Sequence, residues 1–253
     1  MYEPIKKLGQ NFLMDQSLVR VMVGALNIGG GEDIIEIGPG LGALTENIVQ
    51  SIGDKPSNFF AVEIDERFSK KLEDMYSENL NVKVVNDDIL QFLPKFDSQK
   101  TVKIIGSLPY YITSPIIHSI IKMKKKADLC VLLVQREVAE KIKSKAPDAS
   151  YLSSFVQTFY DVEYLGKVEA KKFKPEPEVD GGIIVLKKIH SGLDASETEK
   201  YEGFLHKAYS HPRKMLNKMF TAEELQKGNI NPSLRAQNLN SEDWVNFFRI
   251  LHP

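Results

Sequence analysis

Residues 33–45 read DIIEIGPGLGALT, an apolar run that leads into glycines at positions 38, 40 and 42 and then into residues with helical spacing. The apolar run predicts a buried strand, and the glycines predict a tight turn whose backbone can approach a ligand closely. A helix that begins at this turn would present unpaired N–H groups to that ligand. The spacing differs from the G-x-G-x-x-G pattern of dinucleotide-binding turns, and a turn that binds nothing is the alternative.

Strands and helices are predicted to alternate on both sides of this turn. Apolar or β-branched runs predict strands, and apolar residues at every third or fourth position predict helices between them. The predicted strands cover residues 33–37, 59–64, 82–85, 102–105 and 129–134, and the predicted helices cover 41–52, 66–76, 114–123 and 136–145. This alternation is typical of an α/β fold, with a parallel sheet covered by helices.

The second half of the chain departs from this alternation. Its predicted elements are a helix over 152–160, strands over 162–168 and 182–188, and helices over 197–209 and 242–251. We expect the two late strands to pair as antiparallel strands at one edge of the sheet. Because the composition turns to Gly, Ser and Asp after residue 190, we predict a catalytic α/β domain over 1–190 and a small all-helical domain over 191–253.

Composition excludes several classes of protein. The chain has 253 residues, of which 42 % are hydrophobic and 26 % charged, as in soluble globular proteins rather than disordered or fibrous ones. Residues 1–13 lack the apolar segment of a signal peptide, and no window approaches the ~20 apolar residues of a membrane span. The single Cys130 lies in an apolar run, which predicts a buried, unreactive thiol. We expect a cytoplasmic protein, and a monomer because no heptad pattern is present.

Acidic residues end the next two predicted strands. Glu63 and Asp65 lie about twenty residues after the glycines, where an acid can accept hydrogen bonds from both ribose hydroxyls of a nucleoside. The following strand ends in Asp87 and Asp88, and a carboxylate there can accept a hydrogen bond from an adenine amino group. Helix capping or a solvated loop is the alternative for these two aspartates.

The turn after the fourth predicted strand carries the candidate catalytic residues Ser107, Leu108, Pro109 and Tyr110. An exocyclic amine of a base is a poor nucleophile, and two acceptors placed against its N–H groups favour a tetrahedral nitrogen. The Ser107 hydroxyl and the Leu108 carbonyl are the candidate acceptors, and Tyr110 offers a face on which a flipped base can stack. With the sulfonium methyl of S-adenosylmethionine as electrophile, no strong base is needed. An ordinary turn with an exposed aromatic residue is the alternative.

A second aromatic residue opens the proline-rich segment FKPEPEVDG at residues 173–181. This stiff loop can hold Phe173 against the other face of the base. Packing of Phe173 in the core is the alternative. No metal site is predicted.

The set GQNFL (9–13), EIGPGLGALT (36–45), EID (63–65), LPY (108–110) and F-x-P-x-P-x-V-D (173–180) resembles the small-subunit rRNA adenine N6,N6-dimethyltransferases. The resemblance spans nearly the whole chain, including the helical tail. It implies a class I S-adenosylmethionine-dependent methyltransferase domain with a Rossmann-like fold. It also implies transfer of four methyl groups to two adjacent adenosines in the 3′-terminal hairpin of small-subunit (16S) rRNA, during assembly of the small ribosomal subunit.

The same resemblance implies roles for individual residues. Asn11 and Leu13 would shape the methionine end of the cofactor pocket, and Glu63 would hold the ribose. Asp88 would contact the adenine of the cofactor. Tyr110 and Phe173 would enclose the target base. The candidate cofactor-binding residues are Gln10, Asn11, Leu13, Glu36, Gly38, Gly40, Glu63, Asp88 and Ser107.

Two departures from the family pattern leave rival functions open. Ser107 stands where the family has asparagine, and residues 149–153 read ASYLS where the family reads YGRLS. Serine still accepts a hydrogen bond but is shorter and lacks the amide donor. A non-catalytic or weakly active ribosome-assembly factor is therefore one alternative, and a large-subunit rRNA adenine N6-methyltransferase is another. The glycine spacing disfavours a nicotinamide-dependent oxidoreductase.

The net charge of −1 conceals an uneven distribution. Residues 1–100 have 10 basic and 16 acidic side chains, whereas residues 101–174 have 13 basic and 7 acidic side chains. A basic excess beside the catalytic turn favours a nucleic-acid partner, and solvated helix faces are the alternative. We predict rRNA within an assembling small subunit as the partner, and we expect the helical domain over 191–253 to dock on this RNA or on the ribosome. The predicted RNA-binding residues are Lys124, Lys125, Lys171, Lys172, Arg213 and Lys214.

Overall fold

The computed structural model describes residue 5 and residues 8–253, and the chain forms two compact units. The first unit contains Met1–Ala139 and Glu163–Lys188, and the second contains Glu140–Val162 and Ile189–Pro253. Residues 140–162, which the sequence pattern assigns to the catalytic domain, thus pack with the C-terminal helices. The division of functions at residue 190 stays a prediction.

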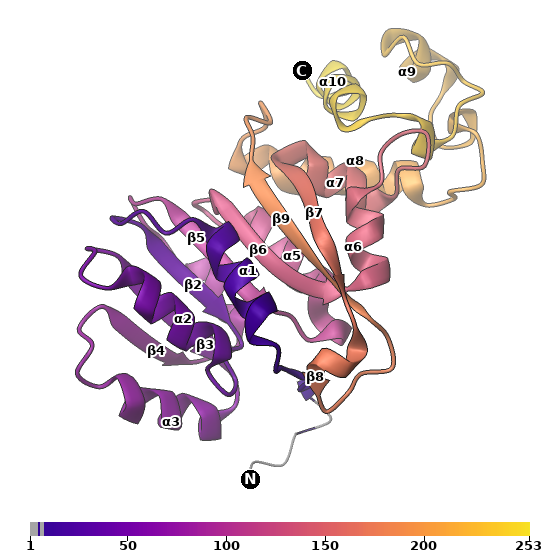
Figure 1. The fold of residues 1–253 in the computed structure, drawn as a ribbon. Coiled ribbons are helices and arrows are strands. Elements are labelled where there is room, and N and C mark those ends of the chain that lie inside the picture. The colour runs from indigo at the N-terminus through magenta and orange to yellow at the C-terminus, as the bar shows by residue number, and fades with distance from the viewer. Residues whose placement is uncertain (1–4, 6–7) are drawn as a thin grey trace. The chain divides into compact units, whose positions relative to one another are not determined.

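A seven-stranded sheet in the order β4-β3-β2-β5-β6-β9-β7 forms the centre of the first unit (Figure 1). Its strands are β2 (Asp33–Ile37), β3 (Asn58–Glu63), β4 (Val82–Asn86), β5 (Val102–Ser107), β6 (Leu129–Gln135), β7 (Tyr160–Val168) and β9 (Gly181–Lys188). Strands β2 to β6 pair in parallel, and β9 is antiparallel to β6. The predicted α/β fold, with late strands at one edge, is confirmed.

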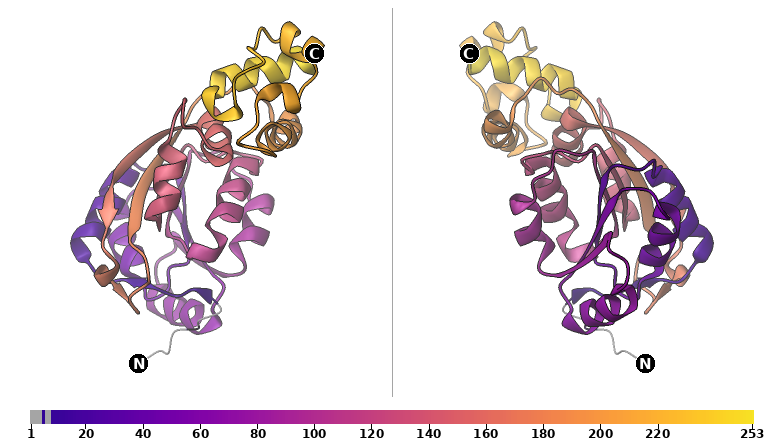
Figure 2. Two further views of the ribbon diagram at one scale, coloured as in Figure 1. Left: turned by 90° about the vertical axis from the view of Figure 1, so that its right-hand side faces the viewer. Right: turned by 90° about the vertical axis from the view of Figure 1, so that its left-hand side faces the viewer.

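Helices cover both faces of this sheet (Figure 2). They are α1 (Gln16–Leu26), α2 (Ala43–Ile52), α3 (Glu66–Tyr76), the short α4 (Ile89–Phe92), α5 (Thr113–Lys122) and α6 (Arg136–Lys143). Helix α1 was not predicted. It begins at Asp15, whose carboxylate accepts the N–H groups of Ser17 and Leu18, and it packs against α2 and β6. Its buried Met22 and Leu26 belong to the main apolar core.

Two short strands form a second, antiparallel sheet that joins distant parts of the first unit. Strand β1 (Phe12–Leu13) pairs with β8 (Phe173–Lys174), and Leu13 lies opposite Phe173. The Met14 N–H group also donates to the Lys172 carbonyl at 2.8 Å. This pairing fixes the N-terminal segment beside the aromatic residue of the proline-rich loop.

The second unit is helical and has an aromatic core. Its complete helices are α7 (Tyr151–Phe159), α8 (Ala195–Tyr209), α9 (Ala222–Lys227) and α10 (Ser241–Leu251). Helix α10 packs against the other three, and the fully buried rings include Tyr201 and Trp244. The hydroxyls of Thr158 and Tyr201 lie 2.9 Å apart in this core. Helix α7 belongs with the C-terminal helices because it packs against α8 and α10, and this buried hydrogen bond adds to that packing.

Two expectations about the environment of the chain can be compared with the structure. None of the helices in the described part of the chain is long and apolar enough to cross a membrane. Cys130 is fully buried in β6, and burial raises the pKa of its thiol. The predicted burial of the thiol is therefore confirmed, and its lack of reactivity stays a prediction.

Candidate active site

One cavity of the first unit lies at the carboxyl ends of the parallel strands and is also lined by residues 8–13 of the N-terminal segment and by Phe173 of β8. Ligands of open α/β sheets bind at this end of the strands. The predicted residues that line the cavity are Gln10, Asn11, Leu13, Glu36, Gly38, Gly40, Glu63, Ser107, Leu108, Pro109, Tyr110 and Phe173. The fold thus brings together residues that are as far as 163 positions apart in the sequence.

The glycine turn forms one wall of the cavity. Gly38 and Gly40 have φ angles of +64° and +54°, a backbone conformation that side chains disfavour. A Cβ atom on Gly40 would lie 2.9 Å from the Phe12 ring, so glycine permits this ring to rest on the turn. A Cβ atom on Gly38 would meet nothing within 4 Å. The turn therefore leaves open space on its cavity side for a ligand that contacts the backbone.

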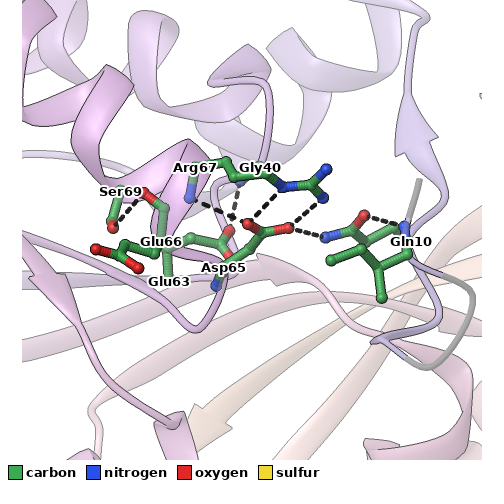
Figure 3. A network of polar contacts seen from close by, with 8 residues as sticks. Gln10, Gly40, Glu63, Asp65, Glu66, Arg67 and Ser69 are labelled. Carbon is green, nitrogen blue, oxygen red and sulfur yellow. Dashed lines mark hydrogen bonds and ion pairs between the residues drawn. The ribbon is translucent and has the colours of Figure 1, made fainter. Parts of the chain in front are cut away.

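The Glu63 carboxylate at the end of β3 is held by backbone N–H groups (Figure 3). One oxygen accepts from Gly40 and the other from Asp65, both at 2.9 Å. Burial raises the pKa of Glu63, although these two hydrogen bonds oppose the shift. Because each carboxylate oxygen has a second acceptor site, Glu63 can still accept hydrogen bonds from two hydroxyls of a ligand.

Gln10 links the N-terminal segment to the same corner of the site. Its side-chain amide donates to Asp65 at 2.8 Å, and the Asp65 carboxylate also accepts from the Arg67 guanidinium at 2.7 Å (Figure 3). The hydrogen bonds from Arg67 and Gln10 lower the pKa of Asp65 to about 2. Gln10 lines the cavity, and its side chain holds the segment in place.

Glu36 at the end of β2 is a buried carboxyl group with one unused oxygen. Its Oε2 accepts from the Thr45 hydroxyl at 2.7 Å, and no described residue bonds to Oε1. Burial raises the pKa of Glu36 to about 8, and the neighbouring Glu63 adds to the shift. Glu36 thus lines the cavity and has one buried oxygen without a hydrogen-bond partner among the described residues.

The pKa of Glu36 predicts how stability depends on pH. The folded protein favours the protonated carboxyl, so the contribution of Glu36 is complete below about pH 4.3 and is lost as pH rises through about 8. We expect the free energy of unfolding of Glu36→Gln to fall less than that of the wild type as pH rises from about 4.3 to about 8. Thermal unfolding of both proteins from pH 5 to 9 measures the difference, and a difference that is constant with pH would contradict this interpretation.

The charge of the cavity restricts its ligands. Among the described residues, the acidic side chains that line it are Glu36, Glu63 and Asp87, and no Lys, Arg or His lines it. The raised pKa keeps Glu36 protonated near neutral pH, so the negative charge of the cavity comes from the carboxylates of Glu63 and Asp87, which favour a cationic ligand over an anionic one.

The side chains of the two aspartates after β4 make different contacts. Asp87 lines the cavity, whereas the Asp88 carboxylate caps α4 by accepting from the Leu90 N–H group at 2.9 Å. The Asp88 N–H group in turn donates to Asp87. Adjacent acids alternate in direction along the chain, so the sequence alone could not say which one faces the cavity. A contact of Asp88 with an adenine stays a prediction.

The candidate catalytic turn begins where β5 ends. The Leu108 N–H group donates to the Leu133 carbonyl of β6 at 2.9 Å, which fixes the turn to the sheet. Ser107 is half-buried and Leu108 is buried. The Tyr110 hydroxyl is buried without a hydrogen-bond partner among the described residues, and burial raises its pKa to about 12. Tyr110 therefore stays a neutral aromatic ring in the cavity wall.

Phe173 reaches the cavity from β8, and its side chain is 5 % exposed. The loop that follows it is anchored by Asp180. The Asp180 carboxylate accepts from the Ala170 N–H group at 3.0 Å and pairs with Lys167 at 2.9 Å. These contacts hold the loop that carries Phe173.

The predicted RNA-binding residues differ in their surroundings. Lys171 pairs with Glu169 at 3.0 Å, and Lys172 pairs with Asp15. These acidic partners offset two of the predicted charges, which the sequence could not show. Lys124 is exposed and Lys125 is half-buried in the first unit, and Arg213 and Lys214 are exposed in the second. Their contact with RNA stays a prediction.

Comparisons with known proteins agree with this site. The sequence model of the ribosomal RNA adenine dimethylase family matches residues 4–252. Ribosomal RNA small subunit methyltransferase A of Mycoplasmopsis pulmonis is 37 % identical, over 96 % of this chain and 97 % of its own. The protein of the same name from Sulfurihydrogenibium sp. is 33 % identical, over 98 % of this chain and 96 % of its own.

Solved structures show the same fold. A dimethyladenosine transferase from Plasmodium falciparum has a TM-score of 0.76 and 21 % identity, over 93 % of this chain and 95 % of its own. The 23S rRNA methyltransferase ErmE has a TM-score of 0.74 and 23 % identity, over 96 % of this chain and 100 % of its own. The predicted Rossmann-like methyltransferase fold is thus confirmed, and the chain belongs to the ribosomal RNA adenine dimethylase family.

Proposed function

We propose that this protein transfers methyl groups from S-adenosylmethionine to N6 of two adjacent adenosines in the 3′-terminal hairpin of small-subunit rRNA. We place this reaction in the cytoplasm, on an assembling small subunit. The observation that carries the proposal is the single cavity in which the glycine turn, the Ser107–Tyr110 turn and Phe173 meet. The names of the relatives support a methyltransferase that acts on the small ribosomal subunit.

The residues of the cavity fit S-adenosylmethionine. The ligand is cationic at its sulfonium and amino groups, and the cavity has three carboxyl groups and no basic side chain among the described residues. Glu63 would accept from the ribose hydroxyls, the open space beside Gly38 would admit the ligand against the backbone, and Asn11 and Leu13 would enclose its methionine end. When bound, S-adenosylmethionine supplies an electrophilic methyl group.

The chain's own residues then position the target amine. The Ser107 hydroxyl and the Leu108 carbonyl would accept from the N–H groups of the adenine, which directs the nitrogen lone pair to the electrophile. The rings of Tyr110 and Phe173 would hold the base by stacking. No general base is required for attack, because the electrophile already carries a positive charge; the N6–CH3 bond forms as the S–CH3 bond breaks, and the methylated nitrogen then loses one proton to water.

Variants of Ser107 test this role and the rival of a non-catalytic assembly factor. We expect Ser107→Ala to lower the rate of methyl transfer about tenfold or more, since it removes an acceptor from the amine. Ser107→Asn restores the family residue, and we expect it to raise the rate at which monomethylated adenosine is converted to dimethylated adenosine. Mass spectrometry of digested rRNA measures both products. If the wild type is inactive and Ser107→Asn is active, the protein is an assembly factor instead.

Salt dependence tests the proposed RNA surface. Binding of rRNA should weaken as salt rises, because phosphate contacts release counterions. The double variant Arg213→Ala/Lys214→Ala should reduce the slope of log affinity against log salt by about 0.9 for each phosphate that it no longer neutralises. Lys227→Ala is the matched control, because Lys227 lies in the same unit, pairs with Glu223 at 2.8 Å and is not among the predicted RNA-binding residues. A slope near zero for the wild type would rule out this surface.

A further inference from the structure

Tyr111 is a second tyrosine at the mouth of the candidate active site, and the proposed mechanism does not use it. It follows Tyr110 in a single turn of 3₁₀ helix, Tyr110–Ile112. Tyr110 and Ile112 line the cavity, whereas Tyr111 does not. Its side chain is 57 % exposed. Consecutive residues thus place one aromatic ring inside the cavity and one outside it.

The ring of Tyr111 is supported on one side by Gly9 of the N-terminal segment. A Cβ atom on Gly9 would lie 2.9 Å from Cδ1 and 3.0 Å from Cε1 of Tyr111, so only glycine lets the ring approach this backbone. Gly9 has a φ angle of +58° and itself lines the cavity. Tyr111 is therefore held at the rim by a contact with one element of the site, while much of its ring stays in solvent.

Among residues 8–253, no other aromatic ring packs on Tyr111. An exposed aromatic ring beside a binding site offers a face on which a nucleobase can stack. Because Tyr111 is continuous with the cavity wall, its ligand would be the part of the substrate next to the group inside the cavity.

We propose that Tyr111 stacks on the nucleobase adjacent to the one that occupies the cavity. This inference rests on the proposed function and adds a residue that contacts the neighbouring base. When one adenine leaves its stack to enter the cavity, its neighbour loses a stacking partner. A tyrosine ring at the rim replaces that partner. Tyr111 thereby favours substrates with two unpaired bases in succession.

The structure also offers a competing role, in which Tyr111 only holds the N-terminal segment in place. That role needs an apolar side chain over Gly9, and leucine would supply it. If the contact with Gly9 were lost, cofactor binding would also weaken, because Gly9, Gln10 and Asn11 line the cavity. Stacking, in contrast, needs an aromatic ring and leaves cofactor affinity unchanged. The variants Tyr111→Phe, Tyr111→Trp and Tyr111→Leu therefore separate the two roles.

The test is a double-mutant cycle between Tyr111 and the neighbouring base. Small subunits are prepared with either both adenosines or an abasic site in place of one, and methylation of the remaining adenosine is measured. For the wild type we expect kcat/KM to fall about tenfold at the abasic site, because stacking of one base is lost. Tyr111→Leu should show the same low value on both substrates, while Tyr111→Phe and Tyr111→Trp behave as the wild type.

The proposal is overturned if Tyr111→Leu is as active as the wild type, if it still loses activity at the abasic site, or if its cofactor affinity falls in parallel with its activity. If the wild type methylates neither substrate, the proposed function has failed. In that case the affinity of each variant for the two RNA substrates is measured instead of methylation. We then expect the wild type to bind the abasic RNA about tenfold more weakly, and Tyr111→Leu to bind both RNAs equally.

Discussion

Tyr110→Ala is expected to lower kcat/KM for methyl transfer to rRNA by about 100-fold, near the upper end of what loss of stacking on one base produces. The Tyr110 ring lines the cavity beside the Ser107–Leu108 acceptors, and its hydroxyl has no partner among the described residues. The ring and not the hydroxyl should therefore account for the effect. Steady-state methylation of unmodified small subunits measures it.

Tyr110→Phe is the matched control for this variant. It keeps the ring and removes a buried hydroxyl that bonds to no described residue, so we expect activity near that of the wild type and equal or higher stability. Cofactor affinity and the midpoint of thermal unfolding should change little in Tyr110→Leu, which fills more of the space than alanine. Equal activity of Tyr110→Leu and the wild type would show that the base does not stack on this ring.

Glu63→Ala is expected to weaken binding of S-adenosylmethionine by about 100-fold or more, because two hydrogen bonds to a charged acceptor are lost at about 1.5–3 kcal/mol each. The change also leaves the Gly40 and Asp65 N–H groups without their acceptor in the folded protein. A further loss of stability is therefore expected. Isothermal titration of the ligand and thermal unfolding separate the two effects.

Glu66→Ala provides the control, because Glu66 lies three residues away and its side chain is 67 % exposed in a pair with Lys70. An exposed pair of this kind contributes little to stability. We expect Glu66→Ala to bind the ligand as the wild type does. If Glu63→Ala also retained its affinity, Glu63 would not hold the ribose, and the assignment of the strand-end acids would have to change.

The sheet was predictable because its central strands are buried on both faces and read as nearly continuous apolar runs. β2 and α3 match their predicted ranges, and the other central strands differ at their ends by one or two residues. Helix α1 was missed, and so was the pairing of β1 with β8. The strands β1 and β8 are only two residues long, and their pairing joins residues about 160 positions apart. Such contacts depend on the finished fold and leave no local pattern.

The site was predictable to a similar degree and for a related reason. The carboxyl ends of parallel strands meet at one edge, so chemistry-bearing residues at those ends had to converge. The direction in which a side chain points was harder to predict from the sequence. Asp87 rather than Asp88 lines the cavity, and the acidic partners of Lys171 and Lys172 come from packing. The sequence places Glu36 at the end of a buried strand, but it does not show that one carboxyl oxygen is left without a hydrogen-bond partner among the described residues.

The central claim is that one cavity binds S-adenosylmethionine beside the turn whose Ser107 and Leu108 hold the adenine amino group. A single labelling experiment tests this claim directly. The protein is incubated with S-adenosylmethionine labelled in its methyl group and with small subunits that lack the modification. We expect label on two adjacent adenosines of the 3′-terminal hairpin, with two methyl groups on each. Absence of label from these adenosines, or label on large-subunit rRNA instead, would contradict the proposed function.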